Sequence, residues 1–110
     1  MRRGDVVISA DPAAGGYGTK PRPHIVVQAD AFAATESVTL CPVTTTLVQA
    51  DTMRIGIAPN ARNGLKQASW IMADKIMTVR RARVAKIVGR IGADDMNRLD
   101  LALMTFLGLA

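Results

Sequence analysis

Short apolar runs, each bounded by glycine, proline or charged residues, fill the first four fifths of the chain. Runs that alternate between apolar and polar positions, or are rich in β-branched residues, predict half-buried or buried strands. The predicted strands are 6–8, 25–28, 37–43, 53–57 and 68–72, the last continued by 74–79 after a break at Ala73. The segment 59–64 separates two of them and is a predicted turn, because it ends in the dipeptide Asn63-Gly64.

The segment 80–91 is ambiguous. It carries five cations and an irregular apolar pattern, so it fits either a last strand or a basic amphipathic helix. β-branched residues dominate its second half, which favours the strand. Its cations then form a basic flank, which is either a solvated face or the rim of a nucleic-acid site.

The last part of the chain predicts one amphipathic helix of roughly fifteen residues. It begins at Gly92 or Ala93, with two aspartates in its first turn, where negative charge complements the helix dipole. Gly108 ends it. Apolar residues recur at helical spacing at Met96, Leu99, Leu103, Phe106 and Leu107. The pattern as a whole predicts a mainly β domain with a C-terminal α-helix that packs on the sheet or seals it.

Composition adds limits to this picture. A chain of 110 residues that is 49% hydrophobic predicts a single domain, 1–110, with a real core. Aromatic residues make up only 4%, so the core is expected to be aliphatic, and a surface that binds bases mainly by stacking is not expected. The net charge of +5 and a pI near 10.2 favour a polyanion or an acidic protein as partner.

Several site classes are excluded by what the chain lacks. Cys41 is the only cysteine and His24 the only histidine, so neither an intramolecular disulfide nor a Cys/His zinc site can form, and we expect no metal or cofactor. Cys41 is interpreted as a small core residue. No run approaches the length of a signal peptide or the ~20 apolar residues of a membrane span, so the chain is expected to be cytoplasmic and away from membranes.

The first candidate for chemistry is Arg22, which stands between two prolines. Each proline restricts its own backbone and that of the residue before it, so Lys20 and Arg22 are partly ordered before folding. A guanidinium held in this way suits a phosphate; the alternative is a turn with two solvated cations. The loop 11–19 before it either covers a ligand, with Tyr17 stacking on a base, or is a plain connection. His24 is either a general base or structural.

The second candidate is the run Thr44-Thr45-Thr46 at a predicted strand end. Its hydroxyls offer donors and acceptors with stiff side chains, which suits a phosphate or a ribose hydroxyl, although a solvated strand end is the alternative. Asp74, also near a strand end, either orients a cation or accepts a hydrogen bond from a base edge, or else caps a single helical turn. Arg54 is expected to face outward from its strand.

Taken together, these motifs resemble the MazF/PemK/Kid toxins, and the resemblance covers nearly the whole chain in the family's order. The matching pieces are Arg3-Gly4-Asp5-Val6-Val7, Arg22-Pro23-x-x-Val26-Val27-x-x-Asp30-x-Phe32, Pro42-Val43-Thr44-Thr45, Leu65-x-x-x-Ser69, Asp74-Lys75-Ile76-x-Thr78-Val79, Arg83, Gly89-x-Ile91 and Leu103-x-x-Phe106-Leu107-Gly108-Leu109. Each piece is weak alone, but the set is specific.

The resemblance implies a small SH3-like barrel of the CcdB/PemK type, a homodimer, and metal-independent cleavage of single-stranded RNA at short motifs. It also implies an acidic, MazE-like antitoxin that occupies the RNA groove. In this family the ribose 2′-hydroxyl attacks the adjacent phosphate, leaving a cyclic phosphate and a 5′-hydroxyl. The family's catalytic residues fall on Arg22 and Thr44. The further RNA-binding residues that we expect are Tyr17, Lys20, Thr45, Thr46, Ser69, Asp74 and Lys75.

The chain departs from the family's pattern at two places, which concern the general base and the recognised RNA motif. The segment 16–20 replaces a polar Glu-Gln type segment, and Met72 stands where Kid has an arginine. The main alternative is a CcdB-like toxin that binds gyrase and cleaves nothing. Toxins of that class have a tryptophan near the C-terminus. The only tryptophan of this chain is Trp70, far from its C-terminus, so the chain does not resemble that class in this respect. A non-catalytic nucleic-acid-binding barrel is the third interpretation.

Overall fold

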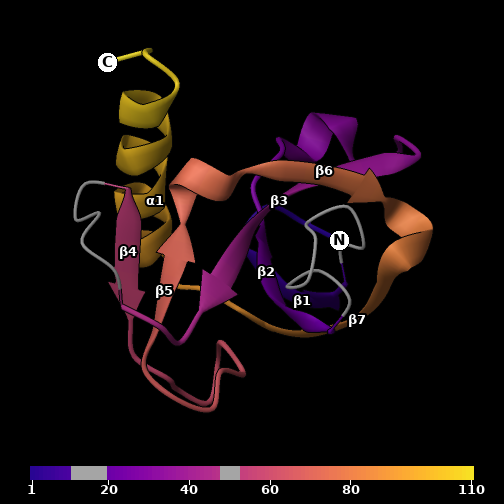
Figure 1. Cartoon of the computed structure of the whole chain (residues 1–110). Helices are drawn as coiled ribbons and strands as arrows, with labels where there is room; N and C mark the ends of the chain where they lie inside the picture. Colours follow the sequence, from indigo (N-terminus) through magenta and orange to yellow (C-terminus); the bar gives the residue numbers. More distant parts are fainter. Residues whose placement is uncertain (11–19, 48–52) are drawn as a thin grey trace.

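The computed structural model describes residues 1–10, 20–47 and 53–110 and shows a strongly curved antiparallel sheet with one α-helix (Figure 1). The described strands are β1 (Asp5–Ser9), β2 (Arg22–Val26), β3 (Ser37–Thr44), β4 (Arg54–Ile57), β5 (Ser69–Met72), β6 (Met77–Arg80) and β7 (Val84–Arg90). The helix is α1 (Ala93–Phe106), and 3-10 turns cover Asp30–Phe32, Ala73–Lys75 and Arg81–Arg83.

The sheet is organised around β3. Its strands follow the order β4-β5-β3-β2-β1-β7, and β6 also pairs with β3. On one edge β3 pairs with β2, and on the other it pairs first with β6 and then, near its end, with β5. β6 leads into β7, and β7 pairs with β1, so the sheet curls into a barrel-like shape (Figure 1). The barrel is not closed, because these two described strands, β6 and β7, do not pair with each other.

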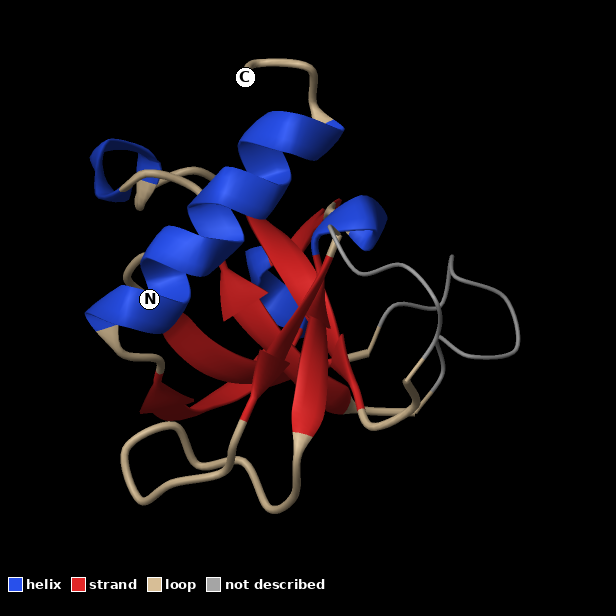
Figure 2. Ribbon diagram, turned by 90° about the vertical axis from the view of Figure 1, so that its left-hand side faces the viewer, coloured by secondary structure: helices blue, strands red, loops and turns tan. Residues whose placement is uncertain are grey.

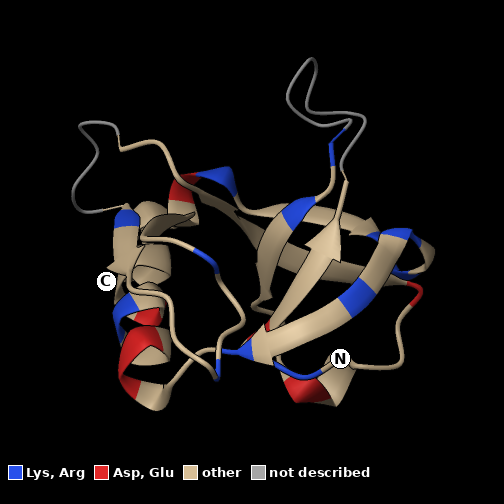
Figure 3. Cartoon of the chain, turned by 90° about the horizontal axis from the view of Figure 1, so that it is seen from below, with Lys and Arg blue, Asp and Glu red and all other residues tan. Residues whose placement is uncertain are grey.

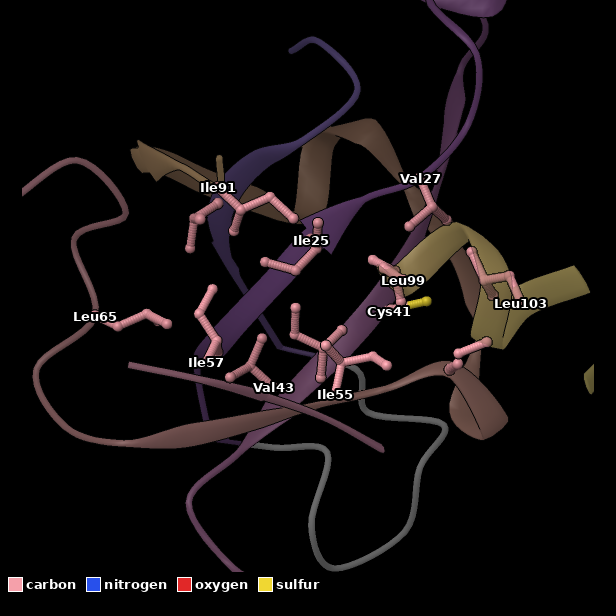
Figure 4. Close-up of a cluster of buried hydrophobic side chains, with 14 residues drawn as sticks. Ile25, Val27, Cys41, Val43, Ile55, Ile57, Leu65, Ile91, Leu99 and Leu103 are labelled. Atoms are coloured by element: carbon pink, nitrogen blue, oxygen red, sulfur yellow. The ribbon is translucent and has the colours of Figure 1, made fainter. Parts of the chain in front are cut away.

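Alternation along the strands buries one apolar cluster on each face of the sheet. The larger cluster joins the sheet to α1, which lies across that face through Leu99, Ala102 and Leu103 (Figures 2 and 4). The smaller one lies on the opposite face, inside the curled part of the sheet, and consists of Val7, Val26, Val38, Leu40 and Val79. As the scarcity of aromatic residues predicts, both clusters are aliphatic.

The predicted elements are confirmed with shifts at their ends. The segment 80–91 forms a strand, β7, after a 3-10 turn, so the helical alternative is wrong. α1 begins at Ala93 with Gly92 as its N-cap, and Gly108 follows it with a φ of 75°. Phe106 and Leu107, however, are 43% and 51% exposed, because the apolar stripe extends beyond the part of the sheet that α1 covers. No helix in the described ranges is long and apolar enough to cross a lipid bilayer.

A buried asparagine builds the turn between β4 and β5. The side-chain oxygen of Asn63 accepts hydrogen bonds from the backbone amides of Asn60 (3.1 Å) and Leu65 (3.0 Å), and its amide group donates to the carbonyl of Ala58 (2.9 Å). Gly64 follows with a φ of 69°, a conformation that glycine adopts without strain. The turn dipeptide predicted from the sequence is therefore confirmed.

This turn packs directly on β7. The amide of Arg90 donates to the carbonyl of Arg62 at 2.9 Å, and Gly89 lies against the same stretch of backbone. A Cβ atom added at Gly89 would come closer than 3.0 Å to backbone atoms of Arg62 and Asn63. The absence of a side chain at position 89 is thus what allows the turn and the strand to approach.

Gly89→Ala is expected to destabilise the fold by about 1–3 kcal/mol, because backbone atoms on both sides would have to separate. Gly92→Ala is the matched control, since a Cβ there has nothing within 4 Å, and replacing the N-cap glycine is expected to cost under about 1 kcal/mol. Urea unfolding followed by circular dichroism measures both. Equal losses in the two variants would show that the close approach contributes nothing to stability.

Candidate active site

Pairing between strands places chemically distinct side chains in one line across the sheet, which we call the cross-strand row: Val84, Ser9, Arg22, Thr44, Trp70 and Gly56. Ser9 lies opposite Val84 of β7 on one side and Arg22 of β2 on the other. Across the sheet, Trp70 of β5 lies opposite both Thr44 of β3 and Gly56 of β4. Because residues opposite each other in an antiparallel pair project from the same face, each half of the row shares one face.

The two halves of the row meet at Arg22 and Thr44. The last pair of the β2–β3 ladder is His24 with Pro42, and Arg22 and Thr44 each lie two residues beyond that pair on their own strands. Both side chains project from the face of the ladder on which His24 and Pro42 lie, at the end where β3 leaves β2 and pairs with β5. Arg22 and Thr44, which are 22 positions apart in the sequence, therefore lie at the same end of this ladder.

The backbone of Arg22 is fixed by a buried histidine. Nδ1 of His24 lies 2.8 Å from the carbonyl oxygen of Arg22, and since a carbonyl can only accept, Nδ1 carries the hydrogen. His24 is 3% exposed, which favours the structural interpretation over a general base. The ion pairs of the described residues involve Arg3, Arg54, Arg90 and Arg98, not Arg22. The partly exposed Arg22 thus brings a positive charge to the row that no carboxylate in this part of the chain neutralises.

The hydroxyl of Thr44 is oriented by its own strand end. Its oxygen accepts a hydrogen bond of 3.1 Å from the backbone amide of Thr46. A hydroxyl has one donor and two acceptor positions, so this bond fixes the oxygen and leaves the O–H to act as a donor. Thr44 is partly exposed, while Thr45 and Thr46 are exposed beyond it. The arrangement can donate a hydrogen bond to an anionic oxygen placed near Arg22.

An ion pair flanks the row on the β4 side. Arg54 donates two hydrogen bonds, of 2.8 and 3.1 Å, to the carboxylate of Asp74, and the two side chains are 11% and 13% exposed. Burial alone would raise the pKa of Asp74, but the hydrogen bond and charge of Arg54 outweigh it and lower that pKa below its usual value. Asp74 therefore orients a cation, as one interpretation predicted. The expectation that Arg54 faces outward is wrong, because this carboxylate holds it.

The other predicted site residues lie at different places. Lys20 and Lys75 are exposed, and Tyr17 lies outside the described residues. Ser69 is 4% exposed, lies opposite Ile57 on the face that carries the larger core cluster, and donates its hydroxyl to the carbonyl of Gln67. It is therefore not part of the row, and we remove it from the predicted RNA-binding residues.

Sequence reasoning missed Trp70 as a site residue. The alternation of β5 places Trp70 and Met72 on one face and Ser69 and Ile71 on the other, but only the pairing with β3 shows which face carries Thr44. Ser9 was missed for the same reason: it is buried, and its contact with Arg22 depends on the β1–β2 register.

The remaining candidate groups have structural roles. Burial raises the pKa of the Cys41 thiol to about 12, although Arg3 opposes this, so the thiol stays protonated at neutral pH and the core interpretation is confirmed. Within the described ranges, no three His, Cys, Asp or Glu side chains gather as a metal would require.

Basic residues colour several stretches of the ribbon (Figure 3), and those of the flank predicted for 80–91 divide into structural and exposed cations. Arg81 donates to the carbonyls of Thr35 and Ser37, and Arg90 pairs with Asp5 at 2.9 Å. The cations classed as exposed are Arg80, Arg83 and Lys86. They lie in β6, in the turn after it and in β7, so an exposed basic edge borders the end of the row at Val84.

Comparison with known proteins agrees with this architecture. A family model described as the PemK-like, MazF-like toxin of type II toxin-antitoxin systems matches residues 2–107. The probable endoribonuclease MazF of Mycolicibacterium smegmatis is 46% identical over 110 residues, which cover 100% of this chain and 99% of that protein. Endoribonuclease MazF9 of Mycobacterium tuberculosis is 28% identical, with 99% and 98% of the two chains covered.

Solved structures agree with the fold. A mycobacterial endoribonuclease in complex with its cognate antitoxin superposes with a TM-score of 0.81 at 26% identity, covering 100% of this chain and 97% of that one. These relatives support endoribonuclease activity and do not favour the gyrase-binding alternative. With the family model spanning nearly the whole chain, the protein belongs to the PemK-like, MazF-like toxins of type II toxin-antitoxin systems.

Proposed function

We propose that the cross-strand row holds the scissile phosphate of single-stranded RNA, and that this MazF-type toxin cleaves RNA in the cytoplasm without a metal ion. The observation that supports the proposal most is the position of Arg22 and Thr44 at the same end of the β2–β3 ladder, each two residues beyond its last pair. A guanidinium that no carboxylate of the described residues pairs with, at the same strand end as an oriented hydroxyl donor, suits the two charged oxygens of a phosphodiester.

The reaction that fits this pair is attack by the ribose 2′-hydroxyl on the adjacent phosphorus. The 2′ oxygen loses its proton and bonds to phosphorus, the bond to the 5′ oxygen breaks, and that oxygen takes up a proton. The products are a 2′,3′-cyclic phosphate and a 5′-hydroxyl. Negative charge builds on the phosphoryl oxygens during this step, so Arg22 stabilises the transition state electrostatically, whereas its high pKa makes it a poor general acid. Thr44 holds one of these oxygens and so keeps attack in line.

The proposal extends to partners. The mycobacterial relative was solved with its cognate antitoxin, and we infer that an acidic, MazE-like antitoxin binds this toxin over the same row. The net charge of +5 and the guanidinium of Arg22 suit both an acidic segment and RNA. We further propose a homodimer as the working unit. The exposed Lys20, Thr45, Thr46 and Lys75 remain the proposed additional RNA contacts.

Arg22→Ala is expected to abolish cleavage. Purified protein is incubated with mixed single-stranded RNA in EDTA and the fragment ends are mapped; the unmodified chain is expected to give cyclic-phosphate ends at a short motif. Arg22→Lys should keep only part of the rate, because an ammonium cannot bind two oxygens in a fork. Arg2→Ala is the matched control. It removes an exposed arginine just before the start of β1, whereas Arg22 lies opposite the other end of that strand. Full activity of Arg22→Ala would remove Arg22 from the mechanism.

Thr44→Val is expected to lower the cleavage rate about 10²- to 10³-fold, the usual loss for one hydrogen-bond donor to a transition-state oxyanion. Valine keeps the shape and β-propensity of threonine, so the melting temperature should change by only a few degrees. Thr44→Ser restores the hydroxyl and is expected to recover most of the rate. If Thr44→Val cleaves at the normal rate, or if the variant unfolds, Thr44 has a structural role and not the proposed one.

A further inference from the structure

We propose that Trp70 is a stacking platform for an unpaired base adjacent to the scissile phosphate. The inference rests on the proposed function for the position of the phosphate, and it adds the group that binds a base there. A single stacking ring is compatible with the expectation, drawn from a composition with 4% aromatic residues, that the surface does not bind bases mainly by stacking.

Trp70 lies next to Thr44 in the cross-strand row. It lies directly opposite Thr44, and the Cβ atoms of opposite residues are about 4.5–5.5 Å apart. A phosphate held by Thr44 and Arg22 therefore lies beside the indole, on the face that both side chains share. The base attached to the neighbouring ribose is within reach of that ring.

The indole of Trp70 also packs over a glycine of the neighbouring strand. On its other side Trp70 lies opposite Gly56, and a Cβ atom added to that glycine would be 3.4 Å from Nε1 and 3.6 Å from Cδ1 of the indole. The pyrrole edge of the ring thus lies over a position with no side chain. A glycine in the middle of a strand weakens the strand, and a close approach of this kind is a recognised reason for one. Trp70 remains partly exposed, so the ring is supported from below and accessible to a ligand.

No other aromatic ring of the described residues is placed for this role. The chain has one Trp, one Tyr and two Phe, and Tyr17 lies outside the described residues. Phe32 belongs to a 3-10 turn and lines an apolar hollow together with residues of α1, and Phe106 is on α1 itself. Both therefore lie by the helix, which covers the opposite face of the sheet.

The charges around Trp70 also favour a base over a second phosphate. Past Trp70 and Gly56, the next opposed pair is Met72 with Arg54, and the Arg54 guanidinium is bound by Asp74. The surface thus changes from a cation and a hydroxyl at Arg22 and Thr44 to an indole and a thioether. Bases stack on aromatic faces with little sequence preference, and removing such a face weakens binding about 5- to 150-fold.

The test uses the fact that Trp70 is the only tryptophan, so the intrinsic fluorescence at its wavelength reports this one ring. The probe is a single-stranded 2′-O-methyl RNA of mixed sequence, which binds but cannot be cleaved by 2′-hydroxyl attack. Titration is expected to quench the fluorescence, while inorganic polyphosphate, which has charge but no bases, should bind without quenching. Equal quenching by both, or RNA binding by anisotropy with no quenching, would overturn the inference.

Variants separate stacking from folding. Trp70→Leu is expected to raise KM about 5- to 150-fold with kcat little changed, and Trp70→Phe, which keeps a ring, should recover most of the loss. Gly56→Val keeps the tryptophan but places side-chain atoms where the indole lies, so it is also expected to raise KM. If Trp70→Leu unfolds, the KM of Gly56→Val tests the stacking role in its place. Phe106→Leu, on the far face, is the matched control. An unchanged KM in Trp70→Leu, with Arg22→Ala inactive, refutes the stacking role alone, whereas no cleavage by the unmodified protein refutes the proposed function.

Discussion

The pairing of β3 on both of its edges is the constraint on which the rest of the structure depends. One edge holds β2, and with it Arg22; the other holds β6 and then β5, and with the latter Trp70. The 3-10 turn Ala73–Lys75 separates β5 from β6 and lets the strands pair with different stretches of the same edge. Thr44 is the last residue of β3, where Trp70 lies opposite it, and Arg22 opens β2 two residues beyond the last β2–β3 pair.

Several of the arginines are bound by carboxylates and are therefore less available to bind an anionic ligand. Arg3, Arg54, Arg90 and Arg98 are each held by a carboxylate: Asp100, Asp74, Asp5 and Asp95 respectively. Three of these pairs join different elements, namely α1 to the N-terminus, the turn after β5 to β4, and β7 to β1, whereas Arg98 and Asp95 both belong to α1. Pairing with a carboxylate removes most of a guanidinium's attraction for phosphate. Arg22 differs because the ladder positions it and none of these pairs includes it.

Local patterns predicted the elements but not the contacts between them. Strand and helix periods are properties of neighbouring residues, so β1 to β7 and α1 could be predicted from the sequence within a few positions. The same holds for the turn at Asn63-Gly64. The Arg54–Asp74 pair and the opposition of Trp70 to Thr44 depend on strand register, which is set by loop lengths and core packing. Arg22 and Thr44 could be proposed together because the family resemblance adds the long-range information that periodicity lacks.

The register also gives a physical meaning to one departure from the family pattern. Met72 stands where Kid has an arginine, but the residue opposite it, Arg54, supplies a guanidinium to the same pair of positions from the neighbouring strand. Asp74 binds that guanidinium through two hydrogen bonds and neutralises its positive charge. The Arg54–Asp74 pair therefore joins β4 to the turn after β5. The pair is therefore not equivalent to a free arginine at position 72. Arg22 is the only charged residue of the row, so the phosphate binding proposed there depends on this one side chain, and the surface beyond β3 carries the proposed base contact at Trp70.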